Sequence, residues 1–567
     1  MTQVGHITPG TNYTVRAGDS LWAIAVQAYG NGAQWPRIYD ANKQLIGNNP
    51  NLIHPGQVLH IPPTSAPLPP APTPKPLPPA TPVPPLRNDV DIQGDVLAPF
   101  NKDHRTYLFL RLPDQARGRA WLGALIPLLA NTKDVAAFNA LFSQGHAATG
   151  KDPANLKATW VNVSLTYEGL KLLLKADPAG ALNGQGFNSF VAGPLQRTDI
   201  NGDTGKSDPK NWVVGKANQT IHALLNIQAD DVKDLAAEVQ KLQALAAQHG
   251  VTTVFQQDGE TLPEPLTGHE QFGFKDGISQ PGIASFDVVD PNSLHLDPTA
   301  KLGFVLGHPG TEIIAAGEFV LGKDVEPDSG QKFAPPPALS WMLNGSFQVF
   351  RRLSQDVASF NAQLDKSLSH LPPNDPLHAS LGAKLVGRWK SGTPVDLSPD
   401  TDAHLVDDAR INNFNFMTKD AHGNLVSDDA GARCPHFAHI RKVYPRQQNF
   451  FGNRIRRVLR RGVPFGPPFD PANSGSKDVD RGLIFVAYMS SIENKFEFLN
   501  SAWVGSPDFP SPNTGPDPII GDCQRPAPNT VRPGFSQDFQ RFVNATGALY
   551  AFVPSLSALS KIANGSI

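Results

Sequence analysis

A proline-rich stretch divides this 567-residue chain and limits what its two ends can build together. From Pro62 to Pro85, 13 of 24 residues are proline, and most of the others are alanine, threonine and leucine. Proline lacks a backbone N–H and fixes φ, so the segment is expected to be an extended spacer rather than part of a sheet or helix. A ligand for an SH3-type domain is the less favoured alternative. We therefore expect a module over 11–62, a linker over 63–87 and a larger unit over 88–567.

Charge and cysteine content exclude several classes of protein. Lysine and arginine total 49 against 51 aspartate and glutamate, so nothing favours a nucleic-acid partner. Only two cysteines, Cys434 and Cys523, occur, which excludes a disulfide scaffold and favours two thiols over one bridge. Neither a leader peptide nor an apolar run of about 18 residues is visible. The sequence thus predicts a chain without a membrane span, cytoplasmic by default.

The module before the proline-rich stretch has the order strand, helix, helix, strand. Tyr13–Arg16 is expected as a strand, and a helix capped by Asp19 or Ser20 follows it. A second helix is expected over 34–43 and a closing strand over 57–61.

These elements come with two sequence patterns that resemble a LysM domain. The patterns are Tyr-Thr-Val-x-x-Gly-Asp-Ser-Leu-Trp at one end and Pro-Gly-Gln-Val-Leu-x-Ile-Pro at the other. The resemblance implies binding of glycans that contain N-acetylglucosamine, of the peptidoglycan or chitin type, through the loops around Gly18–Ser20 and Asn51–Ile53. A LysM fold used for protein contacts, or for none, is the alternative.

Beyond the linker, strands and helices alternate as in an α+β protein. The region 106–256 has the order strand, helix, strand, strand, helix, strand, which is the ferredoxin-like unit. Its most regular helix, 231–249, is apolar on one face and ends at Gly250.

The opening of this pattern recurs further along the chain. A strand over 346–352 precedes a helix over 355–364, and a buried strand over 482–488 leads into a helix over 490–500. We therefore expect an α+β fold of two ferredoxin-like halves. The first half is expected to span about residues 88–290 and the second about residues 300–567.

Three short motifs of this larger unit carry candidate chemistry. Gly-Phe-Lys-Asp-Gly contains Asp276, Cys-Pro-His-Phe-Ala-His-Ile-Arg-Lys contains His439 and Arg441, and Arg-Arg-Gly-Val-Pro-Phe-Gly begins with Arg460. A carboxylate in a turn can move a proton, an imidazole can bind a metal, and an arginine keeps its charge. Alone each signal is weak, because Asp-Gly is usually only a turn and a run of arginines is usually a solvated face.

Together and in this order, the motifs resemble those of the dye-decolorizing (DyP-type) peroxidases. The resemblance implies a dimeric α+β barrel-like fold, with haem b between the sheet and the helices of the second half. It also implies His439 as the axial ligand of the haem iron, Asp276 as the distal acid–base group and Arg460 as the charge over the iron. Asp517, in Gly-Pro-Asp-Pro-Ile-Ile-Gly, matches the carboxylate that accepts a hydrogen bond from the ligand imidazole. Its plain alternative is a turn-forming aspartate before proline.

Some of these assignments have rivals close by. His436 lies three residues before His439, where the family has an apolar residue, and Arg461 directly follows Arg460. Arg441 is expected to help bind the cofactor by neutralising a haem propionate. The other arginines that the sequence offers for this task are Arg388, Arg454, Arg456, Arg457 and Arg461.

The function predicted from this resemblance is that of an oxidoreductase. It would reduce hydrogen peroxide and oxidise dyes or phenols in one-electron steps. The alternatives are a haem carrier or sensor and a cell-wall glycan-binding protein. Asp276 and Arg460 favour the peroxidase, because a carrier needs neither of them.

Overall fold

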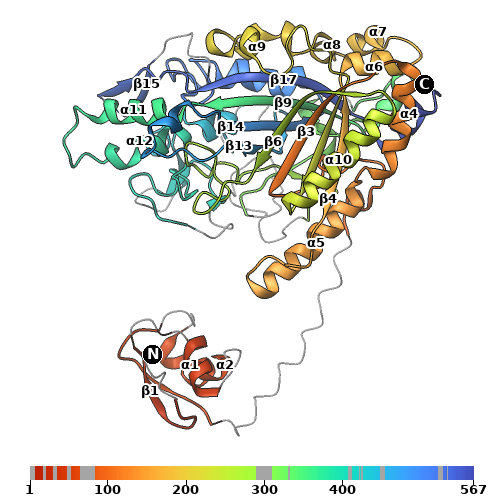
Figure 1. Cartoon of the computed structure of the whole chain (residues 1–567). Helices are drawn as coiled ribbons and strands as arrows, with labels where there is room; N and C mark the ends of the chain where they lie inside the picture. Colours follow the sequence, from red (N-terminus) through yellow and green to blue (C-terminus); the bar gives the residue numbers. More distant parts are fainter. Residues whose placement is uncertain are drawn as a thin grey trace. The chain divides into compact units, whose positions relative to one another are not determined.

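In the computed structural model the chain forms two compact units, residues 1–82 and 83–567 (Figure 1). The described residues are 7–16, 19, 21–29, 35–47, 53–63, 83–288, 309–329, 332–405, 411–419, 422, 425–446, 454–521, 528–532 and 534–567.

The first unit has the predicted order of elements, with one difference. The second helix is interrupted at Asn42, whose side chain donates to the carbonyls of Ile38 and His60 and accepts from the His60 N–H. These side-chain bonds compete with the helical pattern and tie the helix to the closing strand. The elements are β1 (Asn12–Thr14), α1 (Leu21–Tyr29), α2 (Trp35–Ala41), α3 (Lys43–Ile46) and β2 (Val58–His60).

The loops expected to bind glycan are described only at two residues. Asp19 accepts a hydrogen bond of 2.8 Å from the Tyr13 hydroxyl, and Ile53 packs against the apolar core of the unit. The remaining residues of these two loops, like 64–82 of the predicted linker, lie outside the described residues.

The last residues assigned to the linker fold with the second unit. Pro85–Asn88 form the short 3-10 helix η2, in which Leu86 is buried. The Leu86 N–H donates to the carbonyl of Ser285, and Arg87 donates to that of Phe286. Composition alone did not separate these residues from the linker, because the run of prolines continues to the start of the helix.

One antiparallel sheet organises the second unit, and it contains both ferredoxin-like halves. The order is β6-β3-β5-β4 in the first half and β17-β9-β14-β12 in the second, so the fourth strand of each lies beside its first, followed by the third and second. The halves join where β17 pairs with β4. The strands are β3 (His104–Arg111), β4 (Thr159–Leu165), β5 (Ala223–Ala229), β6 (Thr252–Glu260), β9 (Ser346–Gln355), β12 (Leu459–Arg460), β13 (Val463–Phe465), β14 (Gly482–Met489) and β17 (Val543–Val553).

Helices cover the outer face of this sheet (Figure 1). Trp121, Leu242 and Leu559, from three of them, share an apolar core with the strands. The two stretches after β14 are π-helical, whereas the sequence predicted an ordinary helix over 490–500; the wider π turn has no signature in a 3.6-residue pattern. The principal helices are α4 (Gln115–Leu125), α5 (Thr132–Thr149), α6 (Tyr167–Leu173), α10 (Val232–Gln248), α11 (Val357–Leu368), α12 (Leu377–Val386), α14 (His439–Val443), α15 (Leu556–Ala563), and the π-helical η11 (Ile492–Glu497) and η12 (Leu499–Val504).

The sheet curls until its two ends meet. Arg105 of β3 donates to the carbonyl of Arg461 at 2.7 Å. On β6, a Cβ added to Gly259 would lie 2.7 Å from Cγ1 of Val463 on β13, so only glycine permits this approach. A second apolar core, including Tyr107, Phe350 and Tyr488, fills the inside of the curl. The inner face of the sheet is therefore packed, and a ligand site has to lie on its outer face.

Candidate active site

A cavity of about 530 Å³ lies between the outer face of the second half and the segments that cover it. The walls are mainly apolar and come from β9, β14, the π-helical stretches and α14. Apolar residues that line it include Phe272, Phe274, Leu353, Val386, Phe414, Ile440, Leu483, Phe485, Phe496 and Leu499. His439, Asp276 and Arg460, predicted from three separate motifs, all line this one cavity.

His439 is the first residue of α14 and is fixed by Asp517. Its Nδ1 lies 2.7 Å from Oδ2 of Asp517, whose side chain is fully buried. An ionised carboxylate can only accept, so Nδ1 donates and the neutral ring keeps the lone pair of Nε2 for a metal. Burial alone would lower the pKa of His439, but the charges of Asp517 and Asp276 outweigh it and raise the pKa.

Asp517 serves as both the turn former and the histidine partner that the sequence offered as alternatives. One oxygen, Oδ1, accepts from the backbone N–H groups of Ile519 and Ile520. The other, Oδ2, accepts from His439. The turn therefore orients the carboxylate that holds the ring.

His436 is placed differently from its neighbour. It precedes α14, and its Nε2 lies 2.9 Å from the carbonyl oxygen of Asp429. It is not among the described residues that line the cavity. Only His439 of the two presents a ring nitrogen there.

Asp276 faces the free nitrogen of His439. Its Oδ2 lies 3.8 Å from Nε2, and its side chain is 25% exposed. Within the described part of the chain no hydrogen bond to this carboxylate is formed, and the residue lies in a loop without helix or strand. The carboxylate is thus near the ligand nitrogen and free to change its position.

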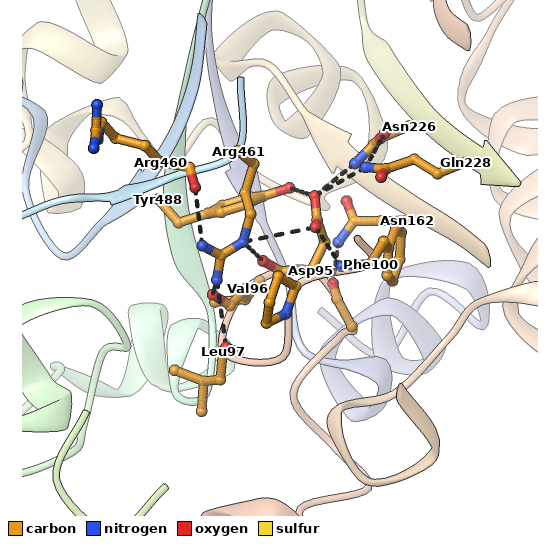
Figure 2. A network of polar contacts seen from close by, with 12 residues as sticks. Asp95, Val96, Leu97, Phe100, Asn162, Asn226, Gln228, Arg460, Arg461 and Tyr488 are labelled. Atoms are coloured by element: carbon orange, nitrogen blue, oxygen red, sulfur yellow. Dashed lines mark hydrogen bonds and ion pairs between the residues drawn. The ribbon is translucent and has the colours of Figure 1, made fainter. Parts of the chain in front are cut away.

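The alternation of β12 decides between the two neighbouring arginines. Leu459 packs in the inner core and Arg460 lines the cavity, whereas the side chain of Arg461, the next residue, bonds the carbonyls of segment 95–97. Figure 2 shows the Arg461 guanidinium within a buried polar network, while the Arg460 side chain points away from it. Burial lowers the pKa of Arg460, partly offset by the negative charge of Asp276. Arg461 also lines the cavity, but its guanidinium is bound within this network, so Arg460 is the one of the two whose guanidinium extends away from it.

Two residues of the Asp276 loop bind Arg460, and the sequence gave no reason to select them. The Arg460 Nη2 donates to the Ser279 carbonyl at 2.6 Å. The side chain of Gln280 accepts from the Arg460 N–H at 3.2 Å and donates to its carbonyl at 3.3 Å. The loop that carries Asp276 and the strand that carries Arg460 are thus joined directly.

Glu270 is a second carboxyl at the cavity that sequence reasoning missed. It accepts from the backbone N–H groups of Phe272 and Phe274 and from the Gln355 amide, and so anchors the start of the Asp276 loop. Burial first, and then the charge of Asp276, raise its pKa to about 7. Its position six residues before Asp276 was the only available signal.

The expected role of Arg441 needs correction. The residue is 2% exposed and is not among the described residues lining the cavity. Its guanidinium donates to the carboxylate of Asp428 and to the carbonyls of Asp428 and Cys434. Arg441 therefore shapes the segment before His439 instead of reaching a cofactor. A guanidinium with five donors can fold a loop as readily as bind a ligand, and sequence does not distinguish the two.

The other arginines divide between cavity and interior. Arg388 and Arg454, both candidates from the sequence, are bound elsewhere: Arg388 to Ser279 and two carbonyls, Arg454 to two glutamates. Arg446, which the sequence did not single out, lines the cavity and lies 3.7 Å over the Phe414 ring. The described arginines that line the cavity are Arg105, Arg446, Arg456, Arg457, Arg460 and Arg461.

The cavity suits a haem in its chemistry. It has an apolar wall for a porphyrin, the Nε2 nitrogen of His439 for the iron and several cations for propionates. A separation of 3.8 Å between Nε2 and Oδ2 is about one van der Waals contact, so a bound porphyrin requires Asp276 to move away from His439. The absence of any hydrogen bond to Asp276 among the described residues permits that movement.

Two further observations concern the rest of the chain. Cys434 is buried and free, while Cys523 lies outside the described residues. Over the part of the chain that the structure describes, every helix is too short or too polar to cross a membrane.

Comparison with known families agrees with this site. The profile of the DyP dimeric alpha+beta barrel domain matches residues 91–263, and that of the Dyp-type peroxidase C-terminal domain matches 376–510. A LysM domain profile matches 13–62. Dye-decolorizing peroxidase msp1 of Mycetinis scorodonius is 33% identical over 506 residues, covering 84% of this chain and 87% of that protein.

Solved structures give the same family. An ancestral D-type dye-decolorizing peroxidase has 32% identity and a TM-score of 0.67, covering 83% of this chain and 98% of that one. A dye-decolorizing peroxidase in complex with 2,6-dimethoxyphenol has 28% identity and a TM-score of 0.66, with coverage of 84% and 99%. The chain therefore belongs to the DyP-type peroxidases, haem-dependent oxidoreductases that act on dyes, and carries a LysM domain in its N-terminal unit.

Proposed function

We propose that this peroxidase uses haem b held by His439, with Asp276 as proton carrier and Arg460 as the stabilising charge. The observation that supports this most is the line of Asp517, His439 and Asp276. One imidazole nitrogen is fixed by a buried carboxylate at 2.7 Å, and the other faces a carboxylate with no fixed partner among the described residues. When bound, the haem supplies an iron that coordinates peroxide and provides the electrons for O–O cleavage.

His439 and Asp517 act on the proximal side. Asp517 keeps the proton on Nδ1 and so directs the Nε2 lone pair at the metal. Because the Asp517 carboxylate is also held by two backbone N–H groups, the ring has one orientation. Such fixed support makes the imidazole a stronger donor.

Asp276 and Arg460 act on the open side. Oδ2 of Asp276 accepts the proton of the peroxide oxygen that binds and returns it to the oxygen that leaves. The Arg460 guanidinium meets the negative charge that develops between them, and its effect is increased because the partly buried group is only weakly screened by solvent. Gln280 and Ser279 keep these two groups in one assembly.

The electron donors that we propose are dyes and phenols. The solved complex of a related peroxidase with 2,6-dimethoxyphenol supports the phenolic part of this proposal. The decisive experiment is an absorption spectrum of the purified full chain before and after one equivalent of peroxide, followed by a phenol or a dye. A spectrum that peroxide changes and the donor restores is expected. Bound haem that does not respond to peroxide would contradict the proposal.

For the LysM unit we propose binding of N-acetylglucosamine-containing glycans, supported by the family match over 13–62. Residues 1–82 should sediment with insoluble peptidoglycan or chitin and be released by soluble N-acetylglucosamine oligomers. If the protein stays in the supernatant with both polymers, the LysM domain does not bind these glycans. The cytoplasmic location remains a prediction, which cell fractionation would test.

A further inference from the structure

A polar network inside the curled sheet surrounds Asp95 (Figure 2). Asp95 is 1% exposed. Its carboxylate accepts from the Tyr488 hydroxyl at 3.0 Å, the Asn226 amide at 2.8 Å and the Phe100 N–H at 3.1 Å. Asn226 lies on β5 of the first half and Tyr488 on β14 of the second. The carboxylate thus links the two halves.

Arg461 connects this network to Arg460 itself. Its Nε donates to the Asp95 carbonyl at 2.9 Å and lies 3.7 Å from the Asp95 carboxylate. Its Nη1 donates to the Arg460 carbonyl at 2.9 Å. Its Nη2 donates to the carbonyls of Val96 and Leu97 at 3.1 and 3.3 Å. One rigid guanidinium therefore binds the segment 95–97 and the peptide of the cavity arginine together.

The backbone at Asp95 is adapted to this contact. Its φ is 69°, a left-handed conformation that few residues other than glycine adopt. The Asp95 N–H donates to the Ala98 carbonyl, which closes a turn and directs three successive carbonyls at Arg461. An aspartate tolerates such a turn better than most side chains, and here its carboxylate is also bonded.

Arg460 requires such support because its strand is short. β12 comprises Leu459 and Arg460 alone, paired with Tyr488 and Ala487 of β14. Two residue pairs at an edge fix a side chain poorly. Leu459 pairs with Tyr488, whose hydroxyl donates to Asp95. The strand pairing and the polar network around Asp95 therefore both hold the short strand β12.

We propose that Asp95, from the first half of the fold, and Arg461, from the second, are positioning residues that fix Arg460 over the open side of the site. The proposal rests on the function proposed above for Arg460. It differs from a purely structural role in one respect: loss of the Arg461 contacts should change what Arg460 does to a small anion at the iron while the fold persists.

Fluoride binding to the haem-loaded full chain, followed by absorbance, tests this without turnover. Arg461→Lys keeps the charge but loses the planar fork that reaches four carbonyls. We expect its fluoride affinity to fall about tenfold, as for removal of an oriented donor, with near-normal haem content. The double variant Arg460→Leu/Arg461→Lys should bind fluoride no more weakly than Arg460→Leu, because a residue acting only through Arg460 adds nothing once Arg460 is gone.

Arg481→Lys is the matched control. Arg481 is 3% exposed and also donates to backbone carbonyls, those of Pro467 and Ser476, but it is not among the described residues lining the cavity. Its replacement should leave fluoride affinity unchanged. Tyr488→Phe removes one bond to Asp95 with little change of shape, and should weaken fluoride binding in the same direction if Arg461→Lys does not fold.

The outcomes separate this proposal from the one on which it rests. If Arg460→Leu itself leaves fluoride affinity unchanged, the role of Arg460 is wrong. Suppose that Arg460→Leu weakens fluoride binding, but that Arg461→Lys and Tyr488→Phe have the same fluoride affinity as the control Arg481→Lys. Arg460 then keeps its role, and the positioning proposal fails. Additive effects in the double variant would also overturn it.

Discussion

The two carboxylates that face His439 are held in opposite ways. Asp517 is fully buried, and both its oxygens are bonded, one to the ring and one to two backbone N–H groups. Asp276 is 25% exposed and has no hydrogen bond among the described residues. In the function proposed above, the first group holds a ligand in one orientation, whereas the second exchanges a proton and makes room for a cofactor. Rigidity is thus placed on one side of the imidazole and mobility on the other.

Arg460 shows that mobility on the open side is selective. Its backbone is bonded by Gln280 and Arg461, and its guanidinium by Ser279. The cation is therefore fixed while its carboxylate neighbour is not. A charge that stabilises developing negative charge works best when it does not have to reorganise.

The most complete loss, that of the cofactor itself, is expected where the rigid side is removed altogether. His439→Ala should lower haem occupancy more than about tenfold, because the axial bond is lost. His436→Ala, three residues away and outside the cavity lining, should load normally. The ratio of haem to protein absorbance measures both, and the reverse result would show that the ligand has been assigned to the wrong histidine.

On the mobile side, Asp276→Asn should bind haem normally, because the amide has nearly the same shape as the carboxylate. It should react with peroxide about 10²- to 10⁴-fold more slowly, because the amide cannot carry the proton. Stopped-flow absorbance gives the rate. An unchanged rate would mean that Arg460 and ordered water carry the step alone.

Asp517→Asn is expected to have a smaller effect of a different kind. The amide cannot hold the Nδ1 proton as a carboxylate does, so haem affinity should fall about 10- to 100-fold. Haem transfer to apomyoglobin measures that affinity. If Asp517→Asn instead matches Asp276→Asn, with haem retained and peroxide reaction slowed, the contrast between the two sides fails.

The anchor of the mobile loop predicts a pH dependence of stability. Glu270 has its pKa raised from 4.5 to about 7, first by burial and then by Asp276, so the folded chain binds this proton more tightly than the unfolded chain. Its stabilising contribution is complete below about pH 4.5 and is lost as the pH rises through about 7. Glu270→Gln should therefore flatten the fall in melting temperature over this range.

Melting followed by loss of haem absorbance measures this dependence. Glu238→Gln, which changes a partly exposed glutamate paired with Lys241 on α10, is the control and should keep the wild-type slope. An unchanged slope in Glu270→Gln would show that Glu270 is ionised throughout.

The smallest effect is expected from removing the first unit. Both sides of the site come from residues after Val83, so a chain starting there should oxidise dye within about twofold of the full chain. A chain starting at Asn88 lacks the buried Leu86 and should melt at a lower temperature. Dye turnover and melting of both truncations measure this. Lost turnover in the longer one would mean that the first unit contributes to the reaction.

Much of the fold was predictable because its signals are local. The strands over 106–112 and 482–488 and the helix over 231–249 each have a pattern of apolar residues that can be recognised in a single sequence. β12 was not predicted, because two residues carry no period, and the π-helical turns were expected as ordinary helix. The end of the linker was misjudged at Leu86, where proline-rich composition continues into a helix that packs on the second unit.

By itself the sequence determined the order of the units and the family, and it singled out His439, Asp276, Arg460 and Asp517. These properties reside in motifs of a few adjacent residues. Tertiary structure decided what depends on residues far apart. The Arg460 and Arg461 side chains point in different directions, because successive residues of an extended chain alternate. Arg441 bonds Asp428 in the interior and does not line the cavity. Tertiary structure also brought Asp95 to a strand more than three hundred residues away. A guanidinium or carboxylate looks the same in sequence whether it binds a substrate or a backbone carbonyl; only the position of its partner distinguishes them.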